Sequence, residues 1–474
     1  MKTTSERELK LAADAGFRLP DLLGEPIKTR TFVSTYHDTA DLRLAASAIT
    51  LRHRIEGRVG VWQLKIPQGD ARLEVEVEGD AGAVPMSLEE LLTAVVRSHP
   101  VIPVAALRTE RAGVLVHDGI DDSLVEVVRD SVVVLEGGQG GRFDELELEL
   151  LKGDGAALRR VERLLRRAGA GDTDSRAKLF QVLDVPGPDA GNPDDDGAKR
   201  LAAAIAAQGR AILANDPGTR LGVDPEHLHR HRVAVRRLRA MLRAARPMLD
   251  REWADDLRGE LGALGSVLGP VRDADVLMAR LQTQAARLGD ADGPACLPLL
   301  QALSSERSVA RTLMLHALRS PRYLRLLDRL DQAAAALPVI DPGIDLRDVA
   351  AAEYRKLLRD HRRLSESPSD DSLHALRIRA KRARYAAELA APDDRKWKHL
   401  ITRTKQVQEL LGEHQDAHVA ETRLRELAGR TTGVETHLAA GRLIEQERGR
   451  RRHSRRHFPK AMHRLERAHR RAIR

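Results

Sequence analysis

Alternating charged and apolar residues dominate the first 150 residues of this chain. In RLEVEVE (72–78) and ELELE (145–149) every second residue is a glutamate, whereas LRHRI (51–55) and WQLKI (62–66) alternate apolar residues or histidine with Arg, Gln or Lys. Residues two apart project to one side of a strand, so each stretch predicts a strand with one apolar and one charged face. Three neighbouring carboxylates on one face repel one another unless a cation or a basic neighbour lies opposite.

Two sheet arrangements fit this pattern. An open antiparallel sheet with one solvated face is the simpler one, but such a face normally mixes Thr, Ser, Lys and Glu. A closed β-barrel would instead place the acidic strands opposite the basic ones and turn the leucines outward, to be covered by helices such as one predicted at 155–169. In MKTTSERELKL, Glu6, Glu8 and Lys10 also share one strand face, unless this terminus is simply frayed and solvated.

A polar barrel interior with clusters of both signs predicts a particular ligand. Carboxylate oxygens bind hard divalent ions such as Mg²⁺ or Mn²⁺, while arginine forks and lysine ammonium groups bind phosphate oxygens. A chain of phosphates together with its metal ion satisfies both kinds of residue. No GxxxxGK[ST] motif is present, so phosphate binding through a P-loop is not expected.

The first part of the chain resembles a known family. ERELK (6–10) resembles the ExExK signature of CYTH domains, the triphosphate tunnel metalloenzymes. Further stretches follow in the family order: YHDTADLRL, LRHR, WQLKIP, RLEVEVEGD, VEVVRD, FDELELEL and SRAKLFQVL.

This resemblance implies the roles of individual residues. The metal ligands for Mg²⁺ or Mn²⁺ would be Glu6, Glu8, Glu145 and Glu147. The phosphates would be bound by Lys10, Arg52, Arg54, Lys65, Arg111 and Lys178, with Arg108 as the alternative to Arg111. Asp130 would lie by the water or a second ion, and Glu74 and Glu76 would complete the tunnel wall.

The charge changes sign along the chain near a segment rich in Pro, Gly and Asp. Residues 1–190 hold 25 Lys and Arg against 32 Asp and Glu, and the remaining residues hold 54 against 38. We therefore expect a first domain at 1–185, a linker at 186–197 and a second domain at 198–470. The single cysteine, Cys296, and the lack of an apolar run long enough for a membrane span favour a cytoplasmic protein without disulfides.

The basic part predicts helices with an internal repeat. His229, Arg232, Arg236 and Arg239 recur at helical spacing and form one stripe, beside an apolar stripe. His374, Arg377, Lys381 and Arg384 each follow 145 positions later, and LGPVRDADV (268–276) returns as LGEHQDAHV (411–419). Such recurrence predicts a duplicated helical unit, with repeats at about 198–335 and 345–470. The stripes hold no acids, so an anionic ligand is favoured over a solvated face.

This part resembles the CHAD domain, the conserved-histidine α-helical domain found beside CYTH domains. The resemblance rests on the H-x-x-R-V-x-x-R-R-L-R and L-G-x-x-R-D stretches and implies two four-helix bundles, related by a pseudo-two-fold, that bind inorganic polyphosphate through both stripes and Arg272. In the second copy Gln415 and His418 replace Arg272 and Asp275. The expected fold class is thus α+β multidomain, an N-terminal antiparallel β-barrel followed by an all-α domain.

Several functions stay open at this stage. The favoured one is a metal-dependent inorganic triphosphatase or polyphosphate-processing hydrolase; the same residues would suit a thiamine triphosphatase or an adenylyl cyclase. A non-catalytic adaptor targeted to polyphosphate granules is the alternative from a different class. Nucleic acid is a less favoured ligand, because Phe, Trp and Tyr make up 3% of the chain and the stripes contain none for base stacking. No membrane partner is expected.

Overall fold

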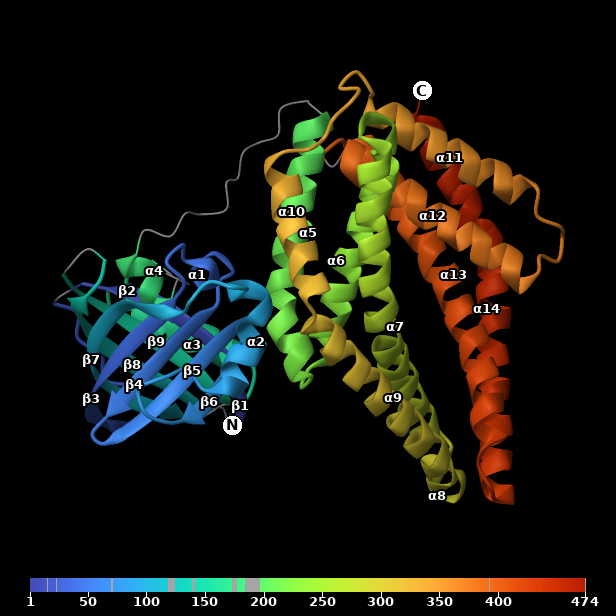
Figure 1. The fold of residues 1–474 in the computed structure, drawn as a ribbon. Coiled ribbons are helices and arrows are strands. Elements are labelled where there is room, and N and C mark those ends of the chain that lie inside the picture. Colours follow the sequence, from blue (N-terminus) through green and yellow to red (C-terminus); the bar gives the residue numbers. More distant parts are fainter. Residues whose placement is uncertain are drawn as a thin grey trace. The chain divides into compact units, whose positions relative to one another are not determined.

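The computed structural model describes residues 1–473, with the exception of 15, 23, 70, 118–123, 139–140, 173–176, 184–196 and 392. Contacts divide the chain into two compact units, residues 1–191 with 213–223, and residues 192–212 with 224–474. The first is built on a sheet and the second on helices, which confirms the α+β class (Figure 1). The linker expected at 186–197 lies outside the described residues except for Gly197, the first residue of a helix.

The first unit contains a nine-stranded antiparallel sheet with the strand order β1-β6-β5-β4-β3-β7-β8-β9-β2. Its strands are β1 (Lys2–Glu6), β2 (Glu8–Ala13), β3 (Gly24–Asp38), β4 (Thr50–Glu56), β5 (Val59–Gln68), β6 (Ala71–Glu78), β7 (Ile102–His117), β8 (Leu124–Glu136) and β9 (Arg142–Lys152). All four stretches that alternate in the sequence lie within strands, as predicted.

The sheet is not closed by pairing between its edge strands, which corrects the expectation of a closed barrel. The edge strands, β1 and β2, are successive pieces of the N-terminal segment, interrupted at Arg7. The segment changes partner there, because β1 pairs with β6 whereas β2 pairs with β9. The Arg7 carbonyl still accepts a hydrogen bond of 3.0 Å from the Leu150 amide. The two sheet edges therefore meet around one residue, and the charged strand faces enclose a common interior.

Helices cover the apolar faces of these strands, as the alternation predicted. Beside α1 (Arg43–Ala46), the unit contains α2 (Met86–Val96), α3 (Gly155–Arg167) and α4 (Lys178–Val182). Leucines and valines of α3 pack on the outward residues of β2, β8 and β9, α2 packs on β4, β5 and β6, and α4 packs on β3, β7 and β8. The apolar cores thus lie outside the sheet and leave its interior polar. Each fully buried side chain of this size contributes about 1.5 to 3 kcal/mol to the stability of the fold.

The second unit is helical. Its helices are α5 (Gly197–Leu221), which the division assigns in part to each unit, α6 (Pro225–Ala244), α7 (Arg251–Arg287), α8 (Gly289–Asp292), α9 (Leu297–Leu318), α10 (Pro321–Ala335), α11 (Leu346–Arg362), α12 (Asp370–Ala390), α13 (Arg395–Ala428) and α14 (Val434–Ala472), with short 3-10 turns at Arg246–Met248 and Pro294–Cys296. No helix in the described part of the chain is both long enough and apolar enough to span a membrane.

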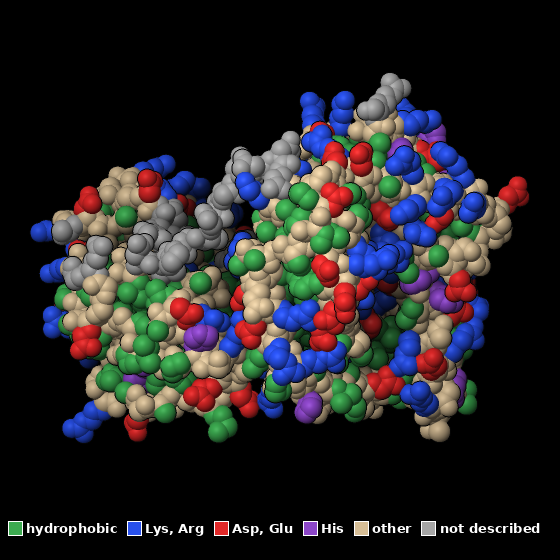
Figure 2. Space-filling model, turned by 45° about the horizontal axis from the view of Figure 1, so that its top comes forward, with side chains coloured by type: hydrophobic (Ala, Val, Ile, Leu, Met, Phe, Trp, Pro, Cys, Tyr) green, Lys and Arg blue, Asp and Glu red, His purple; other side chains and the backbone are tan. Residues whose placement is uncertain are grey.

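The internal repeat is visible in how equivalent helices begin. Asp250 caps α7 by accepting from the Trp253 amide, and Asp394, 144 positions later, caps α13 by accepting from the Trp397 amide. The last two helices of the first copy, α9 and α10, correspond to the single long helix α14. Residues of α7, α9, α13 and α14 pack into one core, so helices of both copies stabilise each other. Lys and Arg side chains are concentrated on the upper right of this unit in Figure 2.

Candidate active site and anion-binding groove

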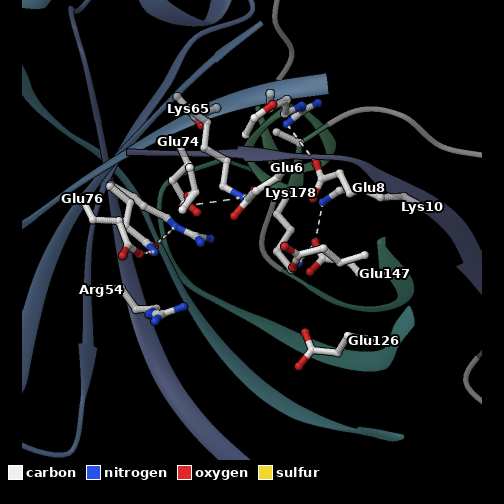
Figure 3. A pocket seen from close by; sticks show the side chains of 18 of the residues that line it. Glu6, Glu8, Lys10, Arg54, Lys65, Glu74, Glu76, Glu126, Glu147 and Lys178 are labelled. Atoms are coloured by element: carbon white, nitrogen blue, oxygen red, sulfur yellow. Dashed lines mark hydrogen bonds and ion pairs between the residues drawn. The ribbon is translucent and has the colours of Figure 1, made fainter. Parts of the chain in front are cut away.

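A cavity of about 380 Å³ occupies the interior of the sheet and is lined from all nine strands and α4 (Figure 3). The predicted residues that line it are Glu6, Glu8, Lys10, Arg52, Arg54, Lys65, Glu74, Glu76, Arg111, Glu147 and Lys178. Two further predicted residues, Asp130 and Glu145, do not line the cavity but are buried against Lys178. Residues far apart in the sequence are thus brought to one site.

Lys178 is the centre of one charged cluster. Its Nζ lies 2.8 Å from Asp130 Oδ2, 2.5 Å from Glu145 Oε1 and 2.7 Å from Glu147 Oε1, and Lys10 Nζ lies 2.6 Å from that last oxygen. Burial would raise the pKa of Glu147, but the charges of Lys10 and Lys178 hold it well below its ordinary value. The three carboxylates are close enough together to hold a metal ion, and the two lysines neutralise them in its place.

Arg111 extends this cluster and is fixed by it. Its Nε donates to Asp130 Oδ1 at 2.7 Å, and its Nη2 donates to Asp130 and Glu147. Arg108, the alternative suggested by the sequence, is exposed on the same strand. The structure therefore places Arg111, and not Arg108, in the cavity.

Lys65 is the centre of a second cluster. Its Nζ lies 2.6 Å from Glu6 Oε2 and 3.7 Å from Glu74 Oε1. Burial and a hydrogen bond with Glu6 raise the pKa of Glu74 to about 8. Burial acts in the same direction on Glu6, but the hydrogen bond from Glu74 and the charge of Lys65 outweigh it and lower the pKa of Glu6. At neutral pH Glu74 therefore carries the proton that the two carboxyl groups share.

Two glutamates of the cavity lining, Glu149 and Glu126, have no cationic partner among the described residues and lie opposite each other on β9 and β8. Glu149 lies opposite Glu8 in the ladder of β2 and β9. Burial and the charges of Glu6, Glu126 and Glu8 raise the pKa of Glu149 to about 7, although the charge of Lys65 acts in the opposite direction. Among the described residues, neither Glu126 nor Glu149 has a hydrogen bond or ion pair, and Figure 3 shows Glu126 apart from the other labelled side chains. The sequence analysis did not select them as ligands, although Glu149 continues the alternation of ELELE.

This arrangement fits a divalent cation. Like charges that raise one another's pKa are stabilised when a cation binds between them, and carboxylate oxygens are the ligands that Mg²⁺ and Mn²⁺ prefer. The predicted ligands fall on two neighbouring sides of the cavity. On one side lie Glu6 and Glu8, paired with Lys65 and Arg72, together with Glu126 and Glu149, whose oxygens are free within the described residues. On the other side Glu145 and Glu147 lie with Asp130, where lysines occupy the oxygens.

Cationic side chains on β4 provide the other half of the chemistry. Arg52 Nε donates to Gln63 Oε1 at 2.8 Å, and Gln63 in turn donates to Glu76 at 2.6 Å. Arg54 lies 5.3 Å from the ring centre of Phe32 and has no ion pair within the described residues. Burial and the charge of Arg52 lower the pKa of Arg54. An anion bound in the cavity would relieve this repulsion.

A second cavity, of about 880 Å³, lies in the helical unit and is lined by α6, α7, α9, α12 and α13. Seven of the nine residues predicted to bind polyphosphate line it: His229, Arg232, Arg236, Arg272, His374, Arg377 and Lys381. We call it the groove. Both predicted stripes contribute to it.

Equivalent glycines lie against the two stripes. A Cβ atom at Gly269 would lie 3.6 Å from Arg232 Nη2, and one at Gly412 would lie 3.6 Å from Arg377 Nη2. Each guanidinium also faces an aspartate of the helix that carries the glycine. In the first repeat Arg232 Nη1 lies 2.6 Å from Asp273 Oδ1. The pairing of Arg377 with its aspartate is looser, at 4.0 Å. The L-G-x-x-[RQ]-D stretch thus positions one arginine in each repeat.

The pKa of Lys381, in the groove, is strongly shifted. Burial and the charges of Arg377 and Arg236 lower the pKa of Lys381 to about 7. Burial and the charge of Arg272 also lower the pKa of His229. The groove is therefore short of negative charge, which an anionic ligand would supply.

Two predicted residues lie outside the groove lining, and two others were missed. Arg239 lies beside Gly262, and Arg384 pairs with Glu388 at 3.3 Å. Arg280 and Arg423 line the groove, although the sequence analysis did not select them. They stand on α7 and α13, outside the two stripes, so only the packing of these helices against the stripes reveals them.

The departures of the second repeat also have a structural account. Gln415 lines the groove where the first repeat has Arg272, so one cation is missing on that side. His418 is not among the lining residues; its Nδ1 lies 3.2 Å from Asp370 Oδ2. The equivalent residue of the first repeat, Asp275, instead accepts from Arg307 at 2.5 Å.

A sheet that encloses an acidic and basic cavity, followed by duplicated helices around a basic groove, is the arrangement of a triphosphate-tunnel fold joined to a helical domain. The CYTH domain family matches residues 4–177 and the CHAD domain family matches residues 203–425. The chain belongs to the family of proteins that combine these two domains.

Two relatives and two solved structures are similar to this chain. The chain is 31% identical over 492 residues to the uncharacterized proteins MT2285 and Rv2226 of Mycobacterium tuberculosis, strains CDC 1551 / Oshkosh and ATCC 25618 / H37Rv, with 94% of this chain and 92% of each relative covered. PptA from Streptomyces chartreusis has 24% identity and a TM-score of 0.50 over 56% of this chain and 99% of its own; this likeness concerns the fold alone. The CHAD domain from the plant Ricinus communis has 27% identity and a TM-score of 0.48 over 57% of this chain and 93% of its own.

Proposed function

We propose that the protein is a Mg²⁺- or Mn²⁺-dependent hydrolase that cleaves inorganic triphosphate, or the end of a longer polyphosphate, in the cavity of the first unit, and that its groove binds polyphosphate. The observation that carries the proposal is the division of one cavity into a carboxylate side with free oxygens at Glu126 and Glu149 and a cationic side at Arg52 and Arg54. A phosphate chain with its metal ion complements both sides.

The chain's own residues supply binding and charge stabilisation. Arg52 and Arg54 would hold the non-bridging oxygens, and Arg111, fixed by Asp130, would meet the charge that develops as the bond breaks. In the reaction a water oxygen bonds to the terminal phosphorus, the bond from that phosphorus to the bridging oxygen breaks, and phosphate and diphosphate leave. A bound metal would polarise the phosphate oxygens. Glu6, Glu8, Glu126 and Glu149 would hold it.

A substrate made of phosphate alone is favoured by the cavity lining. Tyr36 is the one aromatic residue among the described residues that line the cavity, so a base or thiazole ring would find little to stack on. Thiamine triphosphate and ATP are therefore the less favoured substrates. The groove supports the second candidate function, polyphosphate binding without chemistry, because seven of the nine predicted residues line it whether or not the cavity is active.

Phosphate release from inorganic triphosphate, thiamine triphosphate and ATP, with Mg²⁺, Mn²⁺ or a chelator, tests the proposal. We expect metal-dependent turnover of triphosphate above the other two, and a loss of at least about a hundredfold in Glu6→Gln. Glu110→Gln, which changes an exposed glutamate of β7, is the matched control and should keep parental turnover. Equal turnover in both variants would contradict the assignment. If the parent protein bound polyphosphate but hydrolysed none of the three substrates, the non-catalytic adaptor would be the function that remains.

A further inference from the structure

The C-terminal half of α14 presents a face of basic side chains that the groove does not use. Ten exposed residues form this face: Arg452, His453, Arg456, His457, Lys460, His463, Arg464, Arg467, Arg470 and Arg471. At 3.6 residues per turn they fall within an arc of about 140°, and at 1.5 Å per residue they extend over about 28 Å. We call it the α14 basic face. Its only acid within 449–473, Glu466, lies off this arc and near His361, at 3.7 Å.

These charges are almost free of partners. Within the described residues, the one ion pair of the α14 basic face joins Arg452 to Glu445, at 2.8 Å between their side chains, near the start of the face. Neighbouring like charges on a helix are destabilising, and a long row of them is favoured where an anion binds. The face thus has the charge of a ligand site and lacks an intramolecular counterion.

In the equivalent helix of the first repeat, by contrast, the corresponding cations have intramolecular counterions. Pro321, at the start of α10, corresponds to Pro459 in α14, 138 positions later. The same offset relates Arg322 to Lys460 and Arg329 to Arg467. Arg322 pairs with Glu260 at 2.7 Å, and Arg329 pairs with Asp256 at 2.9 Å. In the first repeat the same positions are therefore neutralised within the protein.

The second repeat has lost the acids that would do this. The offset of 143 that relates Gly269 to Gly412 also brings the buried residues of α7 and α13 into register, so Asp256 corresponds to His399 and Glu260 to Arg403. Neither replacement is acidic. Cations are thus gained on α14 while their counterions are absent from α13, and both differences leave the α14 basic face positive.

We propose that the α14 basic face is a second polyanion site, which binds inorganic polyphosphate separately from the groove and holds one part of a long chain while the groove holds another; this rests on the proposed function of the groove. A straight row of cations suits a linear polyanion. No aromatic side chain lies on the face, which disfavours single-stranded nucleic acid. Two sites on one chain raise the affinity for long polyphosphate by effective concentration, and exposed charges make it sensitive to salt.

The test compares two sets of substitutions in the full chain that remove the same charge. Lys460→Gln, Arg464→Gln and Arg467→Gln change the α14 basic face, and Arg322→Gln, Arg325→Gln and Arg329→Gln change the equivalent helix of the first repeat. Dissociation constants are measured for long-chain polyphosphate, tripolyphosphate and a DNA duplex at two salt concentrations, with circular dichroism to confirm folding.

We expect the face variant to bind long-chain polyphosphate about tenfold more weakly, with tripolyphosphate binding unchanged and the control variant near the parent. Equal losses in the two variants, or a loss restricted to DNA, would overturn the inference. Arg232→Glu with Arg377→Glu separates the two proposals. If that groove variant loses polyphosphate and the face variant does not, the groove function stands and this inference fails; the reverse result supports the α14 basic face and removes the groove.

Discussion

Lys178 Nζ lies 2.8 Å from Asp130 Oδ2, so the short helix α4 directs a buried cation at a carboxylate of β8 that is fully shielded from solvent. The same ammonium group also neutralises Glu145 and Glu147. This relationship ties α4 to the interior of the sheet.

Lys178→Met should destabilise the first unit by about 3 to 5 kcal/mol, because removing one partner of a buried ion pair leaves the other charge uncompensated. Calorimetry in chelator would show the loss. Millimolar Mg²⁺ should recover part of it in the variant, since the three carboxylates can hold a metal ion once the ammonium group is gone. Lys28→Met, at an exposed position of β3, is the control. Parental stability of Lys178→Met would refute the role of this lysine.

Glu149→Gln should stabilise the metal-free protein at pH 8 and leave it unchanged at pH 4. Burial and the neighbouring carboxylates raise the pKa of Glu149 in the folded state to about 7, from an ordinary value of 4.5. Between these two values the folded protein binds more protons than the unfolded chain, so it loses stability as the pH rises. Glutamine cannot ionise and avoids this cost, which we put at about 1 to 2 kcal/mol after solvent screening.

Denaturant titrations of parent and Glu149→Gln at pH 4, 6 and 8, all in chelator, would test this. Glu78→Gln, at the exposed end of the glutamate series on β6, is a matched control with no expected gain. A Glu149→Gln protein that is less stable than the parent at pH 8 would show that the ionised carboxylate is stabilised by groups other than those described.

The strand pattern was predictable because period-two alternation fixes which residues share a face, and it correctly indicated that Glu74, Lys65 and Arg52 meet in one interior. Partner choice was not predictable, since it depends on register. Glu8 lies opposite Glu149 in the ladder, and Lys10 opposite Glu147, which divides the glutamates of ELELE between two environments. The interruption at Arg7 was equally hidden, because alternation continues through it in the sequence.

In the helical unit, spacing revealed the stripes but not how far the groove extends along them. Arg239 follows His229 by ten residues, about 15 Å along the axis, and reaches Gly262 beyond the groove lining. Arg384 leaves it in the same way in the second repeat and pairs with Glu388. Periodicity gives the face of a helix, whereas the length of a groove depends on where neighbouring helices diverge.

Polyphosphate binding in the groove should strengthen by about tenfold between pH 8 and pH 6, because burial and Arg377 lower the pKa of Lys381 to about 7 and a polyanion favours its charged form. Binding at pH 8 should therefore take up a proton, which titration calorimetry in buffers of different ionisation enthalpy detects. Lys381→Met should bind more weakly at pH 6 and lose most of this pH dependence. An unchanged pH profile in that variant would assign the effect to the groove histidines instead.

Asp370→Ala should destabilise the second repeat, and His418→Asp should restore it. Asp370 accepts from Arg455 at 2.5 Å and from Arg451, and His414 and His418 lie within 3.3 Å and 3.2 Å of it. Its loss leaves Arg451 and Arg455 facing each other without a counterion, at an expected cost of about 1 to 3 kcal/mol.

The rescue follows from the duplication. In the first repeat Asp275, the counterpart of His418, accepts from Arg307 of α9, and in the second repeat Arg451 of α14, the helix that corresponds to α9, donates to Asp370 instead. An aspartate at position 418 would therefore face the same arginine that Asp370 now neutralises. We expect Asp370→Ala with His418→Asp to regain most of the lost unfolding free energy, whereas His418→Asp alone should gain none, because it places a second carboxylate beside Asp370. If the effects of the two substitutions were additive in a double-mutant cycle, Asp370 of α12 would not perform the role that Asp275 of α7 has in the first repeat.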